Sequence, residues 1–182
     1  MPRTDGVTTG RGRREVRQAC LPLLMALFLL SACTEAVPPA YVRLSGPAPT
    51  LAGVPADGAQ LLVFWAAWCP PCRQEAPGLR ALARDPPQGL HVVTFGRDAS
   101  LEEVSRFFDG RVPPELNLRL DEGEAATQAL GAETLPTSIL VVEGRLVARF
   151  TGPRKWDAPE MRRLLERLMK ERQAPAASAP LR

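Results

Sequence analysis

The chain has 182 residues, of which 45% are hydrophobic and 24% charged, and its formal net charge is +3. This length and composition fit one globular domain with extensions. The basic excess lies within residues 1–32, and the rest of the chain carries equal numbers of basic and acidic side chains. Because a nucleic-acid-binding surface needs an excess of positive charge, this distribution argues against a nucleic-acid partner.

Residues 1–32 have the three parts of an export signal peptide. Several arginines precede an apolar run from Leu21 to Leu30, and two small residues follow it. The run is too short to span a bilayer, which takes about 20 apolar residues. Together with Cys33, its end resembles the bacterial lipobox. We therefore predict a lipoprotein signal peptide and lipidation of Cys33, with the protein exported and anchored to the membrane, facing the periplasm or the outer surface. An ordinary cleaved signal peptide is the alternative.

Composition also sets the predicted limits of the folded domain. Residues 33–50 are rich in proline and alanine, which predicts an extended linker between the anchor and the domain. Residues 172–182 lack apolar periodicity and are predicted to be a disordered tail. The domain would therefore cover residues 51–171, which is long enough to bury a core without stabilising disulfides.

Within residues 51–171, apolar runs alternate with segments of helical periodicity. The runs that predict strands are 61–65, 91–95, 116–120, 138–142 and 146–150, the last two forming a hairpin. The predicted helices are 71–83, 100–108, 123–130 and 158–172. Ser100 and Glu103 have the spacing of a capping box at the start of the second helix. The alternation predicts an α/β fold with helices flanking a mixed β-sheet.

Cys69 and Cys72 are the two cysteines that remain once the leader and Cys33 are set aside. They follow a predicted buried strand and open a predicted helix. Free amides and the positive end of the helix dipole stabilise a thiolate at Cys69. A spacing of three residues places the two side chains about one helical turn apart, close enough to form a disulfide. We predict a redox-active pair that opens and closes without unfolding the domain.

A structural clasp and half of a metal site are the alternatives for this cysteine pair. A closed zinc site needs four ligands, usually cysteine or histidine. His91 is the only histidine in the chain, and it lies on a predicted buried strand, where a structural role is expected. No metal site is therefore predicted.

Pro70 and Pro71 separate the two cysteines, and neither has a backbone N–H. Of the amides best placed to stabilise the Cys69 sulfur, only that of Cys72 remains. We therefore expect the pKa of Cys69 to lie below the ordinary value of about 8.5 but above the value of about 3.5 found in strong oxidants. This favours a reductase or a disulfide-shuffling role over that of a primary oxidant.

Glu75 and Pro136 are the other residues with a candidate role. Glu75 lies three positions after Cys72 on the same helix face, where a carboxylate could relay a proton to or from the thiol. An ordinary acidic residue near a helix start is the alternative. Pro136 stands before a predicted strand, where either a cis peptide bond or an ordinary edge proline would fit.

These motifs together resemble the thioredoxin superfamily, and most closely its TlpA/ResA-like branch of membrane-anchored thiol–disulfide oxidoreductases. The resemblance is carried by residues 63–72, which include both cysteines, by residues 73–77, and by Leu135-Pro136-Thr137 before the hairpin. It extends in order over about residues 51–170. Residues 100–121 look like the helix and strand that this branch inserts into the thioredoxin core.

The resemblance implies a role for each matching residue. Cys69 would be the attacking thiol, Cys72 the resolving thiol and Glu75 the active-site glutamate. The residues implied to contact the substrate are Trp68, Leu135 and Pro136, the last after a cis bond. The family reduces disulfides of exported proteins, such as apocytochrome c, outside the cytoplasmic membrane. A membrane thiol carrier would supply electrons, and no cofactor beyond the Cys69–Cys72 disulfide is implied.

Two features depart from the family pattern. Thioredoxins proper have a buried acid at the position of Val63, so proton transfer would fall to Glu75 or to water. The Pro70-Pro71 pair differs from the commoner loops, so a redox potential cannot be transferred from relatives.

Two other functions are alternatives to thiol–disulfide exchange. A copper-handling thioredoxin-fold chaperone would have more widely spaced cysteines and a downstream histidine, and no histidine follows His91. A peroxidase of the peroxiredoxin type would have a proline and a threonine at set positions before its reactive cysteine, and residues 62–68 contain neither.

Overall fold

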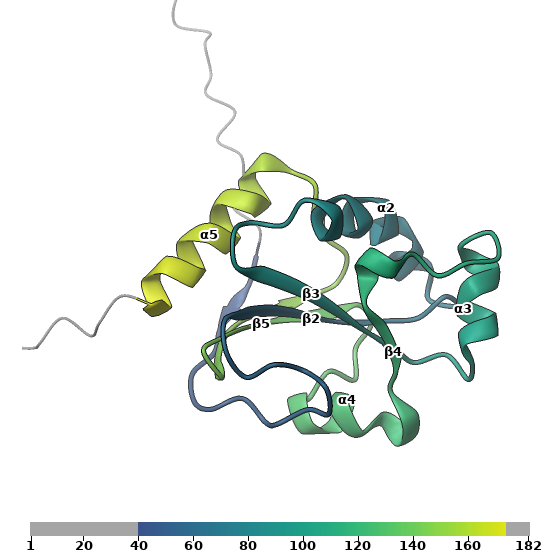
Figure 1. The fold of residues 1–182 in the computed structure, drawn as a ribbon, viewed down its shortest axis with the longest axis horizontal. Helices are drawn as coiled ribbons and strands as arrows, with labels where there is room; N and C mark the ends of the chain where they lie inside the picture. Colours follow the sequence, from purple (N-terminus) through teal and green to yellow (C-terminus); the bar gives the residue numbers. More distant parts are fainter. Residues whose placement is uncertain (1–39, 174–182) are drawn as a thin grey trace, which may run out of the picture. The chain divides into compact units, whose positions relative to one another are not determined.

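The computed structural model describes residues 40–173, and within them six strands form one mixed sheet in the order β1-β6-β5-β2-β3-β4 (Figure 1). The strands are β1 Val42–Arg43, β2 Ala59–Trp65, β3 Leu90–Gly96, β4 Leu118–Leu120, β5 Thr137–Val142 and β6 Arg145–Thr151. Strands β2, β3 and β4 run parallel, whereas β5 is antiparallel to both β2 and β6. The predicted signal peptide and Cys33 lie outside the described residues.

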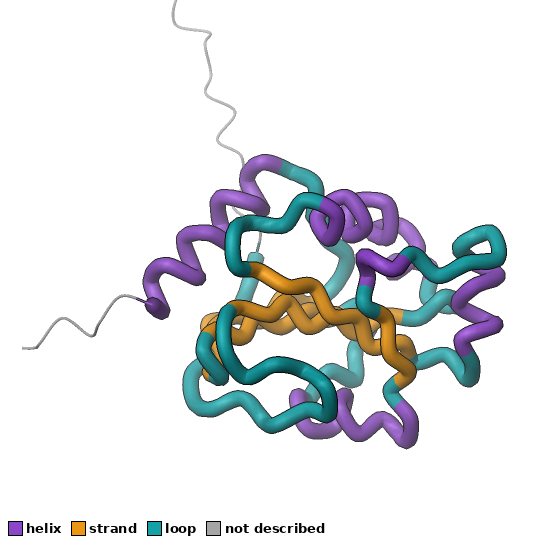
Figure 2. The backbone as a smooth tube through the Cα atoms, viewed as in Figure 1, coloured by secondary structure: helices purple, strands orange, loops and turns teal. Residues whose placement is uncertain are grey.

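Helices cover both faces of the sheet (Figures 1 and 2). Helices α2 Pro70–Arg84, α3 Leu101–Phe107 and α5 Pro159–Gln173 pack on one face, and α4 Ala125–Leu130 packs on the other. The central strand β2 is buried on both faces, because Leu61 and Val63 contribute to one hydrophobic cluster and Leu62 and Phe64 to the other. Burial on both faces explains its continuous apolar sequence.

Helix α2 begins directly after β2 because Cys69 caps it and two prolines occupy its first positions. Proline suits the first helical turn, where its missing N–H would have no intrahelical partner. Buried side chains along one face, including Ala76, Leu79 and Leu82, fix the helix against the sheet. The helix ends at Arg84, before Pro86 and Pro87.

The predicted helix at residues 100–108 is confirmed, together with its cap. The Ser100 hydroxyl accepts the N–H of Glu103, and the Glu103 carboxylate accepts the N–H of Ala99. Phe107 and Phe108 then pack against the ring of Trp65 on β2, with ring centroids 5.3 and 5.7 Å away. This packing attaches the inserted element to the strand that leads into the cysteine pair.

The structure corrects the predicted linker over residues 41–50. Strand β1 pairs with β6, and the segment after it bonds to the same hairpin through Leu44 and Ala48, whose N–H groups donate to Val147 and Gly144. The prolines of this segment lie at the sheet edge, where a missing N–H breaks no ladder. Its apolar side chains Leu44 and Ala48 pack against the hydrophobic cluster that contains Leu62 and Phe64. A segment with the composition of a linker therefore covers part of the sheet.

Two smaller predictions also need correction. His91 is exposed, although it lies on β3 between buried residues. It is the second residue of β3, near the start of the strand. Val93 and Phe95, which alternate with it on the same face, lie further along and are buried. Helix α5 continues to Gln173, past the predicted boundary at residue 171, and residues 174–182 of the predicted tail lie outside the described range.

Candidate active site

Cys69 and Cys72 form a disulfide at the start of α2, with their Cα atoms 5.3 Å apart. Cys69 is the N-cap of the helix, and its Sγ accepts the backbone N–H of Cys72 at 3.4 Å. The prediction that the Cys72 amide is the donor left to the Cys69 sulfur is therefore confirmed. A sulfur held at a helix N-terminus by an amide is stabilised as a thiolate when the disulfide opens.

The two cysteines differ in exposure. Cys69 keeps 4% of its surface exposed, and Cys72 keeps none. Trp68, directly before them, is 61% exposed. Thiol–disulfide exchange with another protein requires contact at a sulfur atom. Of the two cysteines, Cys69 is the one that another protein can reach, and the exposed ring of Trp68 lies next to it in the chain.

Hydrogen bonds from two elements fix the loop that carries the cysteines. The indole N–H of Trp65 donates to the Cys72 carbonyl at 2.8 Å. The N–H of Ala67 donates to both carboxylate oxygens of Asp98 at 3.0 and 3.2 Å. Burial raises the pKa of Asp98 above its ordinary value. Asp98 follows β3 and was not identified from the sequence, because only the parallel pairing of β2 and β3 brings it to this loop.

Glu75 is buried, with 3% of its surface exposed, one helical turn after Cys72. Its Oε2 accepts the N–H of Arg154 at 3.0 Å and the indole N–H of Trp156 at 3.1 Å. Its Oε1 is buried without a hydrogen-bond partner. Burial raises the pKa of Glu75 to about 7, and the two hydrogen bonds oppose this only in part. A group with this pKa can both give and take a proton near neutral pH.

The predicted cis bond is confirmed, since the peptide bond between Leu135 and Pro136 is cis. Pro136 is buried, and its carbonyl accepts the N–H of Gly152 at 2.8 Å. Leu135 is half-buried and packs against the hydrophobic cluster that contains both cysteines. The turn that leads into β5 is closed by the Thr137 hydroxyl, which donates to the carbonyl of Thr134 at 2.7 Å.

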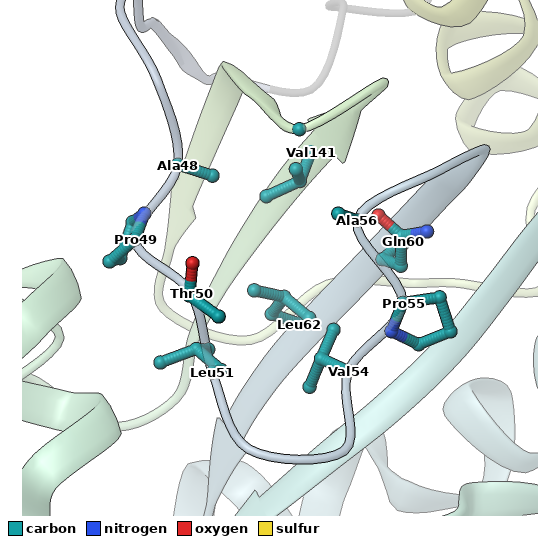
Figure 3. A pocket seen from close by; sticks show the side chains of 11 residues that line it. Ala48, Pro49, Thr50, Leu51, Val54, Pro55, Ala56, Gln60, Leu62 and Val141 are labelled. Carbon is teal, nitrogen blue, oxygen red and sulfur yellow. The ribbon is translucent and has the colours of Figure 1, made fainter.

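A recess of about 50 Å³ lies on the other face of the sheet, between residues 48–56 and strands β2 and β5 (Figure 3). Its lining is mostly apolar, and Gln60 is its largest polar residue. The lining includes no acidic, basic or thiol side chain, and its one hydroxyl belongs to Thr50. The recess is therefore separate from the cysteine pair, which follows the opposite end of β2.

Metal-binding groups do not gather around the cysteine pair. Over residues 40–173, no cluster of three or more histidine, cysteine, aspartate or glutamate side chains is arranged to hold a metal ion.

The mixed sheet with flanking helices, a cysteine pair opening the first of those helices and a cis-proline before the hairpin define a thioredoxin-like domain. The chain belongs to the Redoxin family, whose model matches residues 40–165. The family resemblance predicted from the sequence is thereby confirmed.

Individual relatives agree with this assignment. The thiol-disulfide oxidoreductase ResA of Halalkalibacterium halodurans is 33% identical over 93 residues, covering 50% of this chain and 52% of ResA. The thiol:disulfide interchange protein HelX of Rhodobacter capsulatus is 30% identical over 95 residues, covering 52% of each. The chain thus spans about half the length of these curated relatives. A crystal structure of a proposed thiol:disulfide interchange protein DsbE from Chlorobium tepidum superposes with a TM-score of 0.51 at 27% identity, covering 71% of this chain and 92% of that one.

Proposed function

We propose that this protein is a thiol–disulfide oxidoreductase that reduces disulfides of exported proteins through Cys69 and Cys72. The observation that carries the proposal is the placement of this pair at the start of α2, with Cys69 alone reaching the surface and receiving the Cys72 amide. The names of the relatives ResA and HelX support the same reaction class.

The reaction follows from the two cysteines. In the reduced protein, the Cys69 thiolate attacks a sulfur of the substrate disulfide, forms a mixed disulfide and releases the first substrate thiolate. Cys72 loses its proton and attacks the Cys69 sulfur, which restores the Cys69–Cys72 disulfide and releases the second substrate thiolate. Two electrons pass to the substrate, and protonation completes its two thiols. A thiol donor must then reduce the protein again.

Glu75 is the proposed proton acceptor for Cys72. It lies one turn along the same helix and is shielded from solvent, and one carboxylate oxygen is without a partner. With its pKa raised to about 7, it can take the Cys72 proton when that thiol attacks. Val63, at the position of the acid in thioredoxins proper, cannot do so.

The proposed setting is outside the cytoplasmic membrane. The apolar run before Cys33 and the lipobox-like sequence support export and a lipid anchor. None of the helices in residues 40–173 is long and apolar enough to cross a membrane. We propose a membrane thiol carrier as the electron donor, and exported disulfides such as those of apocytochrome c as substrates.

Reduction of insulin with dithiothreitol as the electron source tests the reaction. The chain from residue 34 onward should accelerate insulin reduction, and Cys69→Ser should bring the rate back to that of dithiothreitol alone. Equal rates for the wild type and Cys69→Ser would refute the proposed function. A circular dichroism spectrum of the variant controls for folding.

A further inference from the structure

Arg97 connects the loop that carries the cysteine pair to the segment that precedes the cis-proline. It follows β3, and its backbone N–H donates to the carbonyl of Trp65 at 2.9 Å. Its own carbonyl accepts the indole N–H of Trp68 at 3.4 Å. The main chain of Arg97 therefore holds both the end of β2 and the exposed ring next to Cys69.

The side chain of Arg97 extends to the other segment. One guanidinium nitrogen donates to the carbonyl of Glu133 at 3.2 Å, and another pairs with the carboxylate of Glu124. Glu133 precedes the cis-proline segment by two residues. The side chain of Arg97 is only 16% exposed, whereas that of its partner Glu124 is 49% exposed. Charge-assisted hydrogen bonds of this kind are stronger than neutral ones.

We propose that Arg97 is a positioning residue that prepares this site for polypeptide disulfides as opposed to small ones. Trp68 directly precedes Cys69 and bonds to the Arg97 carbonyl. Leu135 packs against the cluster that contains Cys69 and belongs to the segment that Arg97 holds through Glu133. A polypeptide that brings its disulfide to Cys69 must lie across both segments, so its binding depends on their relative position. A small disulfide has to reach Cys69 only. This inference rests on the proposed function and assigns to it a residue that favours protein substrates.

Arg149 offers a matched control. It is also a half-buried arginine, and its guanidinium donates to the carbonyls of Gly131 and Leu130 at 3.0 and 2.6 Å. It therefore anchors the same chain segment, but further from Leu135 than Arg97 does. Replacing Arg97 by glutamine removes one hydrogen bond to that segment and the ion pair with Glu124, and replacing Arg149 by glutamine removes two hydrogen bonds to that segment.

The experiment measures single-turnover oxidation of the reduced protein by tryptophan fluorescence, with insulin or with cystamine as the disulfide. Arg97→Gln should raise the half-saturating insulin concentration about tenfold, the effect expected when one charge-assisted hydrogen bond is lost. Its maximal rate and its rate with cystamine should stay within about twofold of the wild type. Arg97→Lys should recover part of the loss, and Arg149→Gln should leave both substrates unaffected.

The outcomes separate this inference from the proposed function. Equal losses in Arg97→Gln and Arg149→Gln, or an equal loss with cystamine, would mean that Arg97 only stabilises the fold, and the inference would fail. A wild type that reacts with cystamine but not with insulin would also overturn it, while leaving the reactive cysteine in place. A wild type that reacts with neither would refute the proposed function itself, and the inference with it.

Discussion

Gln60, at the start of β2, and Glu75, in the helix that follows β2, each bury one side-chain oxygen without a hydrogen-bond partner. An unpaired buried acceptor costs about 1–3 kcal/mol in either place. The amide of Gln60 cannot ionise and faces an apolar recess, whereas the carboxylate of Glu75 can take up a proton and lies one turn from Cys72. Of these two buried oxygens, only that of Glu75 belongs to a group that can change its protonation next to the cysteine pair.

The largest effect is expected when Glu75 can no longer titrate. Glu75→Gln should slow closure of the Cys69–Cys72 disulfide by about a hundredfold, in the usual range for loss of a general acid–base group. Stopped-flow mixing of the reduced protein with a substrate disulfide measures this step. The wild-type rate should rise as the pH passes about 7, because only the ionised carboxylate of Glu75 can accept the Cys72 proton. The variant should lack that rise. An unchanged rate and pH profile would remove Glu75 from the mechanism.

The pH dependence of the unfolding free energy should reveal the raised pKa of Glu75 without any measurement of thiol exchange. Burial raises the pKa of Glu75 from the ordinary 4.5 to about 7, so between these values the folded protein holds a proton that the unfolded chain has lost. The contribution of Glu75 to the unfolding free energy is therefore largest below pH 4.5, falls as the pH rises, and levels off above about 7. The fall should be about 3 kcal/mol at most. Urea unfolding of Glu75→Gln should show a smaller fall over this range.

A smaller effect is expected at Asp98, a buried carboxylate that holds the loop before the cysteine pair. Asp98→Ala removes the acceptor of the Ala67 N–H and should lower insulin reduction about fivefold, equivalent to one hydrogen bond. Asp98→Asn keeps an oxygen acceptor and serves as the control, with activity near that of the wild type. If both variants lost activity equally, the charge of Asp98 rather than its hydrogen bond would matter.

The smallest effect is expected at the recess. Gln60→Leu removes the unpaired oxygen together with the contact that the amide nitrogen makes to the carbonyl of Asp57. The unfolding free energy should rise by about 1 kcal/mol, because the removed oxygen costs more than the lost hydrogen bond contributes. Insulin reduction should stay within about twofold of the wild type. A large loss of activity would show that the two ends of β2 are coupled.

Several local features were predictable from the sequence because their causes lie within a few residues. The capping box at Ser100, the helix start at Cys69 and the amide left free by Pro70 and Pro71 all follow from short-range geometry. The cis bond before Pro136 was predicted only through the family resemblance, since the local sequence allowed either isomer.

The predictions that the structure corrects depend on contacts between residues far apart in the chain or on position along a strand. Residues 41–50 have the composition of a linker, and only pairing with β6 makes them part of the sheet. His91 is exposed because of its place along β3, which the apolar pattern of that strand does not reveal.

The class of fold, the cysteine pair at a helix start and the donor left to Cys69 were predictable without a structure, because they depend on strand and helix periodicity and on neighbours in the chain. The groups that surround that pair follow only from the folded structure. Arg154 and Trp156 reach Glu75 from about 80 positions away, and Arg97 reaches Glu133 across 36. Such contacts depend on how the sheet pairs distant strands, and no local pattern encodes them.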